Sequence, residues 1–392
     1  LPVVDLAGLG PEAAEREARR LDLAHARVPF DLSAGPILRS ELFRLAPGLA
    51  CLRLEVHHIA SDLWSVMVLV RELAAGYTAF AAGQAPTLPP LPLQYHDFAA
   101  WQSRHLAGPV LEEQLAFWRQ ALEGAPTELA LPTDRPRPAR ASEAGASREL
   151  WLSPAELAAL QELASRQGAT LFMVLLAGFA ALLARYSDQR EVIVGTAVAG
   201  RVRTELEGLV GFFINNLPLR LSLAGEPSFA RLVERAREMA AGAFGHQDLP
   251  FEKLVEELAP PRNLASTPYF QVALLLQNVP EQDLHLPGLE IRALPRSSQT
   301  AKLDLTLATV EQPEGLRMIA EYRRELFDPE TIDRLLGNFR CLLASAAARP
   351  EEPFAALALL TEPERAELLG FNATARELGP LVPIHEAIEA QV

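Results

Sequence analysis

Cysteine is scarce in this sequence: Cys51 and Cys341 are the only two among 392 residues. Two cysteines make no disulfide framework, and they suit a reducing compartment. The first residues, Leu1-Pro2-Val3-Val4-Asp5, show no basic region followed by an apolar core, so they do not indicate a secretory signal. Together these absences predict a cytoplasmic protein.

Basic residues are also in deficit, with 36 lysines and arginines against 50 aspartates and glutamates and a net charge of −14. This balance argues against nucleic acid and against an anionic membrane surface as partners. The longest apolar run, residues 171–184, is too short to span a bilayer and predicts a buried core helix. Because 49% of the residues are hydrophobic, the chain can bury a large core in one bilobal unit or in two domains.

Motifs for three common kinds of site are missing. There is no Gly-x-Ser-x-Gly sequence and neither cysteine lies in a motif, so no covalent nucleophile is indicated. The histidines show no HExxH-like spacing, whereas a metal site needs three or four convergent ligands. The glycines at 195–200 have the wrong spacing for a dinucleotide fingerprint. The sequence therefore predicts no metal and no dinucleotide site.

The stretch from His57 to Ser65 is the strongest candidate for a functional site. Residues 51–56 before it alternate between polar and apolar side chains, which is typical of a half-buried strand. Residues 63–80 after it are rich in leucine, valine and alanine and predict a helix, with Ser61 or Asp62 suited to the N-cap. Two histidines and an aspartate are thus expected at a strand-to-helix junction, where a fold can hold a turn rigidly.

Proton transfer is the chemistry that this stretch favours. Adjacent side chains in an extended segment point to opposite sides, so His57 and His58 should not share one task. Imidazole takes or gives a proton near neutral pH, since its unperturbed pKa is about 6.5. The pattern of His57, His58 and Asp62 favours catalysis over two further interpretations, a pair of polar residues satisfied in a turn and a metal site.

Periodicity and turn residues predict further elements. Before the histidines they are a charged amphipathic helix at 11–26 and two strands of one sheet at 37–45 and 50–56. After the histidines they are a strand at 148–152, a helix with its N-cap at Ser153, a buried helix at 170–186 and a buried strand at 192–199.

His57-His58-x-x-x-Asp62, followed by Trp64-Ser65, resembles the signature of the condensation domains of non-ribosomal peptide synthetases. Four later stretches resemble further motifs of that family, in the same order along the chain. They are Tyr-x-Asp-(aromatic)-Ala-x-Trp at 95–101, Val-Gly-x-Phe-Val-Asn-Thr at 210–216, (His/Asn)-Gln-Asp-x-Pro-Phe-Glu at 246–252, and a less complete match over Arg262-Asn263 and 267–272. The chain departs from the family at Leu63, where the family has glycine.

The resemblance implies an α/β chain with a two-lobed fold similar to chloramphenicol acetyltransferase, each lobe a sheet flanked by helices, with a tunnel between the lobes. We expect an N-terminal lobe at 1–130, a C-terminal lobe at 131–360 and, at 361–392, a linker into the start of an adenylation domain. The family's opening strand, helix and arginine-bearing motif have no counterpart in this sequence. The N-terminal lobe is therefore expected to be incomplete at its start, and the chain to be a fragment of a longer enzyme.

Roles for the site residues follow from the same resemblance. Within the catalytic motif of His57, His58 and Asp62, it is His58 that is expected to deprotonate the amine or to hold it in line, and these two roles stay open. Asp62 could orient His58 as in a catalytic triad or form a structural ion pair. The resemblance favours the ion pair, with Arg201 as its partner across the lobes, and His57 is expected to be structural. The remaining residues, expected to be structural or to line the tunnel, are Leu63, Trp64, Ser65, Trp101, Asn215, Gln247 and Asp248. Without the resemblance, the aromatic residues at 95–101 are more typical of core packing.

The implied reaction forms an amide bond between a donor acyl or peptidyl thioester and the amine of an acceptor aminoacyl thioester. The donor arrives on an upstream peptidyl carrier domain and the acceptor on a downstream one, each attached to 4′-phosphopantetheine. The chain itself is expected to bind no cofactor, and an adenylation domain is expected to follow it.

Two alternatives stay open. The chain could be a catalytically silent condensation-like module that docks carrier proteins or tailoring enzymes; Leu63 favours this, and the intact His57-His58 opposes it. It could also be an epimerisation domain, against which Trp64-Ser65 and Asn215-Asn216 count. A heterocyclisation domain is excluded because such domains replace the histidines with aspartate. Trp64-Ser65 is similar to domains that take a donor of L configuration.

Overall fold

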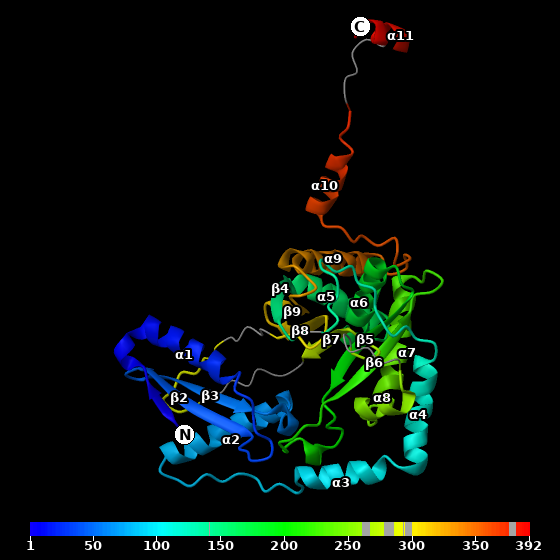
Figure 1. Ribbon diagram of the computed structural model, residues 1–392. Coiled ribbons are helices and arrows are strands. Elements are labelled where there is room, and N and C mark those ends of the chain that lie inside the picture. Colours follow the sequence, from blue (N-terminus) through cyan, green and yellow to red (C-terminus); the bar gives the residue numbers. More distant parts are fainter. Residues whose placement is uncertain (141, 261–266, 278–285, 293, 295–299, 376–381) are drawn as a thin grey trace.

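Two separate β-sheets, each with helices beside it, divide the molecule into two lobes (Figure 1). The structure is a computed structural model that describes residues 1–140, 142–260, 267–277, 286–292, 294, 300–375 and 382–392. The Arg262-Asn263 pair of the fourth later motif lies outside the described residues. The predicted α/β class with two sheets flanked by helices is confirmed.

The smaller lobe contains a three-stranded sheet in the order β1-β2-β3. Its strands are β1 (Val3–Asp5), β2 (Leu38–Ala46) and β3 (Leu49–Val56). β1 runs parallel to β2, and β2 runs antiparallel to β3. The helix α1 (Pro11–His25) covers one face, where the small Ala14 and Ala18 let it approach the buried Phe43. The predicted helix at 11–26 and the predicted pair of strands are confirmed.

The predicted strand at 51–56 is present, and the side that it buries is the polar one. Arg53 is buried at 7% exposure, whereas Leu52 and Leu54 are 41% and 40% exposed. The guanidinium of Arg53 contacts three carboxylates, those of Asp22 in α1, Glu41 in β2 and Glu55 in β3. On β3, the side that faces α1 therefore carries a charge cluster, while its leucines point away from α1.

The larger lobe contains a six-stranded sheet in the order β4-β9-β8-β7-β5-β6. Its strands are β4 (Gly145–Leu152), β5 (Glu191–Val198), β6 (Asn215–Ser222), β7 (Val272–Gln277), β8 (Leu305–Gln312) and β9 (Gly315–Arg323). The pairs β5–β7 and β7–β8 are parallel, and the other neighbours are antiparallel. The helices of this part of the chain are α5 (Pro154–Arg166), α6 (Leu171–Ser187), α7 (Phe229–Gly245), α8 (Phe251–Leu258) and α9 (Pro329–Ala348).

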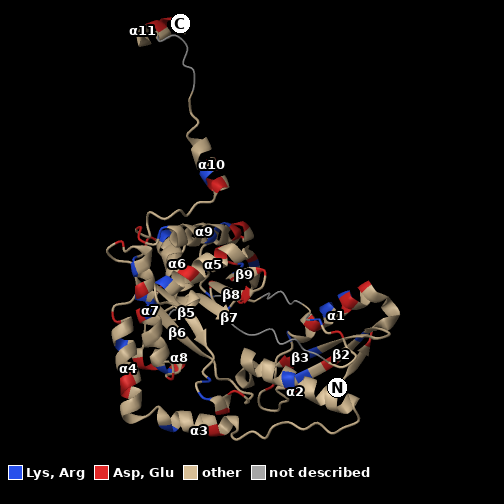
Figure 2. Cartoon of the chain, turned by 180° about the vertical axis from the view of Figure 1, so that it is seen from behind, with Lys and Arg blue, Asp and Glu red and all other residues tan. Residues whose placement is uncertain are grey.

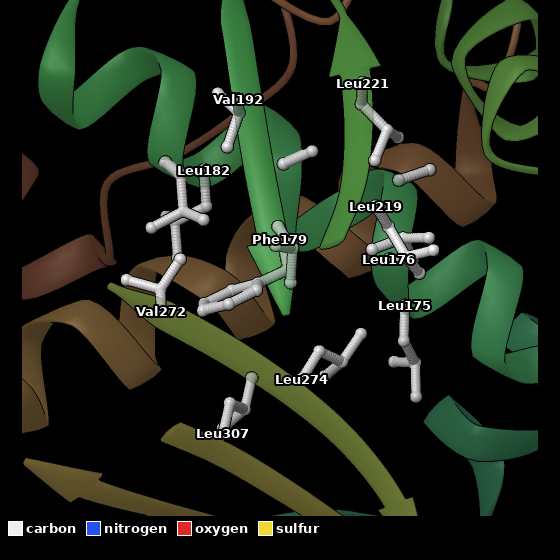
Figure 3. Packing of buried hydrophobic residues seen from close by; sticks show 14 of the residues in the cluster. Leu175, Leu176, Phe179, Leu182, Val192, Leu219, Leu221, Val272, Leu274 and Leu307 are labelled. Atoms are coloured by element: carbon white, nitrogen blue, oxygen red, sulfur yellow. The ribbon is translucent and has the colours of Figure 1, made fainter. Parts of the chain in front are cut away.

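The core of the larger lobe is centred on α6, which is apolar on every side. Figure 3 shows Leu175, Leu176, Phe179 and Leu182 of α6 packed among leucines and valines of β5, β6, β7 and β8. A helix without a polar face is stable only when it is enclosed, as α6 is here. The predicted buried helix at 170–186 is confirmed, and so is the cap of α5, where Ser153 and Glu156 form a capping box.

Two helices connect the lobes, α3 (Tyr95–His105) along the lower edge of Figure 1 and α4 (Gly108–Leu122) upright at its right side. Leu115, Trp118 and Leu122 of α4 belong to the core of the larger lobe. A helix that precedes the predicted boundary at 130–131 therefore packs with the second lobe. The boundary at 130–131 was predicted from the proline-rich sequence that begins after α4. The core of the second lobe begins earlier in the chain, with α4 itself.

Two short helices, α10 (Glu362–Phe371) and α11 (Ile384–Glu389), follow α9 in the predicted linker. α10 is attached at its start, where Asn338 of α9 donates a hydrogen bond of 2.6 Å to Glu364. Leu369 and Phe371 near its end are 62% and 67% exposed. Residues 376–381 of the linker lie outside the described part of the chain.

One described helix, α2 (Leu63–Ala81), meets the length and hydropathy of a membrane span, with 11% of that window buried. α5 and α6 meet the same criterion only as a pair bent by 102°. Arg71 and Glu72 lie in the middle of α2 and would be costly in hydrocarbon. Figure 2 shows that basic and acidic residues are both scattered over the helices. In α1, for example, Arg19 forms an ion pair with Glu15 at 2.7 Å.

Candidate active site

The candidate site begins where β3 ends. The amide of His57 donates to the carbonyl of Ile37, which prolongs the pairing of β3 with β2 by one residue. His57 then acts as the N-cap of a short 3-10 helix (His58–Ala60), because its Nδ1 accepts a hydrogen bond of 3.0 Å from the amide of Ile59. Its ring packs edge-on against Phe30, with centroids 5.5 Å apart. These contacts account for His57 as a residue that shapes the turn.

His58 is exposed and is held by one hydrogen bond, between its Nδ1 and the carbonyl oxygen of Ser61, at 2.6 Å. A carbonyl oxygen only accepts, so Nδ1 must carry the proton. In the neutral ring the lone pair therefore lies on Nε2. The assignment of the tautomer follows from this hydrogen bond, as is usual for histidine. The turn thus presents His58 with a nitrogen that can accept a proton.

Asp62 is the N-cap of α2 and the centre of a buried polar network. Its Oδ1 accepts from the amide of Ser65 at 2.8 Å and from the hydroxyl of Ser65 at 2.7 Å. Its Oδ2 accepts from the amide of Phe213 at 3.1 Å. The predicted ion pair with Arg201 is present, with Nη2 3.2 Å from Oδ1 and both side chains almost fully buried. The carboxylate is thus engaged by these groups and makes no described contact with His58.

The charges of this pair are stabilised by their surroundings. Burial by itself would raise the pKa of Asp62. Hydrogen bonds from Ser65 and from the amide of Phe213, together with the charge of Arg201, outweigh burial and hold the pKa of this carboxylate below its usual value. Burial lowers the pKa of Arg201, and the charge of Asp62 counteracts this. A guanidinium is not deprotonated in proteins, so the pair stays ionic.

Ser65 is fully buried and connects the two lobes. Its hydroxyl oxygen accepts from Arg201 at 2.9 Å and from the amide of Gly211 at 3.1 Å. The hydroxyl also lies 2.8 Å from the carbonyl oxygen of Gly211. Beside it, the indole of Trp64 donates to the carbonyl of Glu207 at 2.9 Å. The first turn of α2 is thus bound directly to the segment between β5 and β6, which Figure 1 shows reaching toward α2 and α3.

Two glycines permit this close approach. Gly200 has a φ of +64°, and a Cβ there would lie 2.1 Å from the carbonyl oxygen of Phe213. A Cβ on Gly211 would lie 2.1 Å from the ring of Tyr95. A larger residue at 200 would displace Phe213, and one at 211 would separate this segment from Tyr95 of α3.

Phe212 was not singled out in the sequence, although the structure places it at the site. Its ring packs edge-on against the imidazole of His58, with centroids 5.2 Å apart. It occupies the variable position of the Val-Gly-x-Phe motif, so no motif signal identifies it. Leu63, by contrast, was predicted at the site, and its side chain is 50% exposed at the start of α2.

The other predicted site residues lie in two clusters that make no described contact with His58. Trp101 packs with Phe98 beside a small core, and its indole stacks on His105 at 4.7 Å. This agrees with core packing for the aromatic residues at 95–101. Asn215 donates to the carbonyls of Gln247 and Leu249 and accepts from the amide of Phe251. Gln247 bonds the carbonyl of Phe244, and Asp248 lies 3.9 Å from His105.

Among the described residues, no group of three or more histidine, cysteine, aspartate and glutamate side chains is placed to hold a metal ion.

The family profile of the condensation domain matches residues 3–369. The chain belongs to the condensation-domain family. Its match extends over both lobes and includes the His57 to Ser65 stretch.

Relatives of this condensation domain are non-ribosomal peptide synthetases. One of the proteins that make up linear gramicidin synthase of Brevibacillus parabrevis is 49% identical over 360 residues, which are 91% of this chain and 5% of that protein. Phosphinothricin tripeptide synthetase PhsC of Streptomyces viridochromogenes is 43% identical over 95% of this chain and 34% of its own length. The chain thus spans only a small part of the curated relatives that it matches.

Solved structures of condensation-type domains have the same fold. The X-domain from teicoplanin biosynthesis superposes with a TM-score of 0.83 at 32% identity, over 92% of this chain and 81% of that chain. The first condensation domain of the calcium-dependent antibiotic synthetase, in complex with a substrate analogue, gives a TM-score of 0.71 at 27% identity, over 92% and 78%. The predicted two-lobed architecture is thus confirmed, and the tunnel between the lobes stays a prediction.

Proposed function

We propose that this chain catalyses amide-bond formation between a carrier-bound donor thioester and the amine of a carrier-bound aminoacyl thioester. The observation that carries the proposal is the hydrogen bond from His58 Nδ1 to Ser61, which leaves Nε2 free to accept a proton. Membership of the condensation-domain family supports the reaction class.

The chemistry needs one proton acceptor and no covalent enzyme nucleophile. An α-amine has a pKa of about 8, so about a tenth of it is neutral at pH 7 and able to attack the thioester carbonyl. Attack forms the new C–N bond and gives a tetrahedral adduct that carries an ammonium and an oxyanion. The ammonium transfers one proton to Nε2 of His58, and collapse of the adduct breaks the C–S bond and releases a thiolate. The imidazolium can then return the proton to that thiolate.

Asp62 and Arg201 act in this proposal as the support of the active-site turn. Their ion pair and the hydroxyl of Ser65 bind the start of α2 to the larger lobe, and the turn that carries His58 leads into this helix. Because the carboxylate is already engaged by four donors, it is not the partner that orients the imidazole. Ser61 takes that role through its backbone carbonyl.

The substrates would be delivered by other domains. We propose that an upstream peptidyl carrier domain brings the donor and a downstream one the acceptor, each on a 4′-phosphopantetheine arm, in a cytoplasmic enzyme. Relatives that are peptide synthetases support this arrangement. We also propose that an adenylation domain follows the linker at 361–392.

A second candidate is a domain that docks other proteins without catalysing condensation. A structure of the teicoplanin X-domain in complex with OxyB superposes on this chain with a TM-score of 0.83, so a domain of this shape serves as a docking partner there. The histidine pair and the tautomer of His58 favour catalysis here.

A single-turnover reaction distinguishes these functions. The enzyme that contains these residues is mixed with a donor-loaded and an acceptor-loaded carrier domain, and the acyl group is followed by mass spectrometry. Condensation predicts the donor group on the acceptor carrier, with both carriers required. A folded protein that binds the carriers without transfer would support the docking function. Inversion at the α-carbon without transfer would indicate epimerisation, and equal turnover of free aminoacyl-CoA would indicate a simple acyltransferase.

A further inference from the structure

The imidazole of His58 is held from both lobes. The smaller lobe supplies the carbonyl of Ser61, 2.6 Å from Nδ1. The larger lobe supplies the ring of Phe212, whose centroid lies 5.2 Å from that of the imidazole, with the planes at 76°. Edge-to-face geometry of this kind is favourable between aromatic rings. No other residue is described in contact with the His58 side chain.

One hydrogen bond does not fix an exposed imidazole. The torsion between Cβ and the ring is broad, so the ring of an exposed histidine can turn and exchange its protein hydrogen bond for water. His58 is exposed and has no packed core around it. A proton acceptor has to lie within hydrogen-bond reach of its substrate. A second contact that restricts the ring is therefore expected to raise the rate of proton transfer.

The backbone that carries Phe212 is fixed on both sides. The amide of Gly211 donates to Ser65 at 3.1 Å, and the amide of Phe213 donates to Asp62 at 3.1 Å. The carbonyl of Phe212 itself accepts from the hydroxyl of Tyr95 at 2.8 Å. Every residue of this short segment thus has a backbone hydrogen bond to α2 or to its N-cap, or to α3.

The residues of the segment 211–213 differ in what their side chains contact. Phe213 is buried, and the guanidinium of Arg201 lies 3.9 Å from its ring centroid. Gly211 has no side chain, which its contact with Tyr95 requires. Phe212 is 37% exposed, and its ring makes no described contact other than that with His58. The backbone of this segment and the ring of Phe213 bind the smaller lobe, and the ring of Phe212 adds a contact to His58.

We infer that Phe212 is a positioning residue for His58: its ring restricts rotation of the imidazole, so that Nε2 faces the reacting amine. The inference rests on the proposed function and deepens it. It also explains how docking of the two lobes completes the site, since the larger lobe supplies one of the two contacts to His58.

The test compares three variants of Phe212 in single turnover with carrier-bound substrates. Phe212→Ala should lower the rate at saturating carrier by about threefold to tenfold, the rate equivalent of one lost aromatic contact, with the half-saturating carrier concentration unchanged. Phe212→Tyr should keep the parental rate. Phe212→Leu, which keeps bulk without the aromatic edge, should have a rate between those of the parent and Phe212→Ala. The matched control is Phe80→Ala, at a 70% exposed phenylalanine near the end of α2.

Selective ¹⁵N-histidine labelling gives a second readout. In the parent, the His58 ring should show a protonated Nδ1 and an unprotonated Nε2; in Phe212→Ala, it should show a mixture of tautomers at an unchanged melting temperature. A parental rate and spectrum for Phe212→Ala would overturn the inference. So would an increase in half-saturation at an unchanged maximal rate, because that would make Phe212 a substrate contact. A parental rate for His58→Ala would instead remove the catalytic role of His58 and leave the contact between the rings without a chemical purpose.

Discussion

Nδ1 of His58 lies 2.6 Å from the carbonyl oxygen of Ser61, and this hydrogen bond decides which nitrogen faces a substrate. Ser61 is followed directly by Asp62, the N-cap of α2. The same turn therefore fixes the tautomer of the imidazole and begins the helix that binds the larger lobe. A substitution of Asp62 is therefore expected to disturb the position of His58 through Ser61.

His58→Ala should lower single-turnover amide formation by about 10² to 10⁴, the usual contribution of a positioned acid–base group. The product on the acceptor carrier is measured with both carriers loaded. His96→Ala is the control, because the side chain of His96 is 81% exposed on α3 and makes no described contact with the site. A loss smaller than about threefold would contradict a role of His58 in proton transfer.

Asp62→Asn should destabilise the protein, because it leaves Arg201 buried without its counter-ion. Removing one partner of a buried ion pair costs about 3–5 kcal/mol. Denaturant unfolding should show this loss together with a lower rate of condensation. The double variant Asp62→Asn/Arg201→Met should recover part of the stability, since the unpaired charge is gone. A single variant that unfolds like the parent but is inactive would show that the carboxylate acts in the chemistry.

The same carboxylate predicts how stability depends on pH. The pKa of Asp62 is lowered in the folded protein, whereas in the unfolded chain it is about 3.9. Its contribution is therefore complete above the unfolded value and is lost as the pH falls through the lowered folded value. The stability of the parent should decrease from about pH 5 downward, more steeply than that of Asp62→Asn. Equal slopes for the two proteins in this range would contradict the lowered pKa.

How far the site could be predicted depends on the kind of contact. The pair of Asp62 and Arg201 is implied by the resemblance to the family, and the structure contains it. Phe212 was missed because its ring meets His58 only when the lobes dock, and its position in the motif is variable. Alternation of polar and apolar residues along the chain does not predict a contact between two lobes.

The burial of Arg53 is the second feature that the sequence pattern did not predict. Alternation at 51–56 correctly indicates a strand with two unlike faces, but it does not say which face a helix will cover. α1 brings Asp22 to Arg53, and carboxylates of β2 and β3 complete the cluster, so that the polar face could be buried. The larger core was easier to predict, because α6 is apolar all round and can be stable only inside.

Arg53→Met should destabilise the smaller lobe by about 3–5 kcal/mol, because three carboxylates lose their shared cation. The matched control is Arg44→Met, at an exposed ion pair with Asp5 on the same sheet, which should cost at most about 1 kcal/mol. Denaturant unfolding at neutral pH compares the two. Similar small losses for both variants would show that the cluster around Arg53 is not a source of stability.

Leu63 is the residue at which this chain leaves its family, and its side chain offers the last test. The leucine is 50% exposed in the first turn of α2, so it is not held in the core of the lobe. It directly follows Asp62, and the turn with His58 lies just before it. We predict that the exposed leucine narrows the approach of a substrate arm to His58. Shortening it should then raise the single-turnover rate, by about tenfold for a bulky donor and by less for a small one.

Two substitutions separate this steric effect from a change in the helix. Leu63→Gly reproduces the family residue, but glycine in a helix is less favourable than alanine by about 1 kcal/mol. Leu63→Ala removes the bulk and keeps helix propensity, so it should show the same preference for the bulky donor without loss of stability. Leu73→Ala, at a leucine 42% exposed further along α2, is the control and should change neither rate. If Leu63→Ala and Leu63→Gly leave both donors at the parental rate or below it, the leucine does not obstruct the arm. The glycine of the family would then serve the geometry of the helix start rather than access to the site.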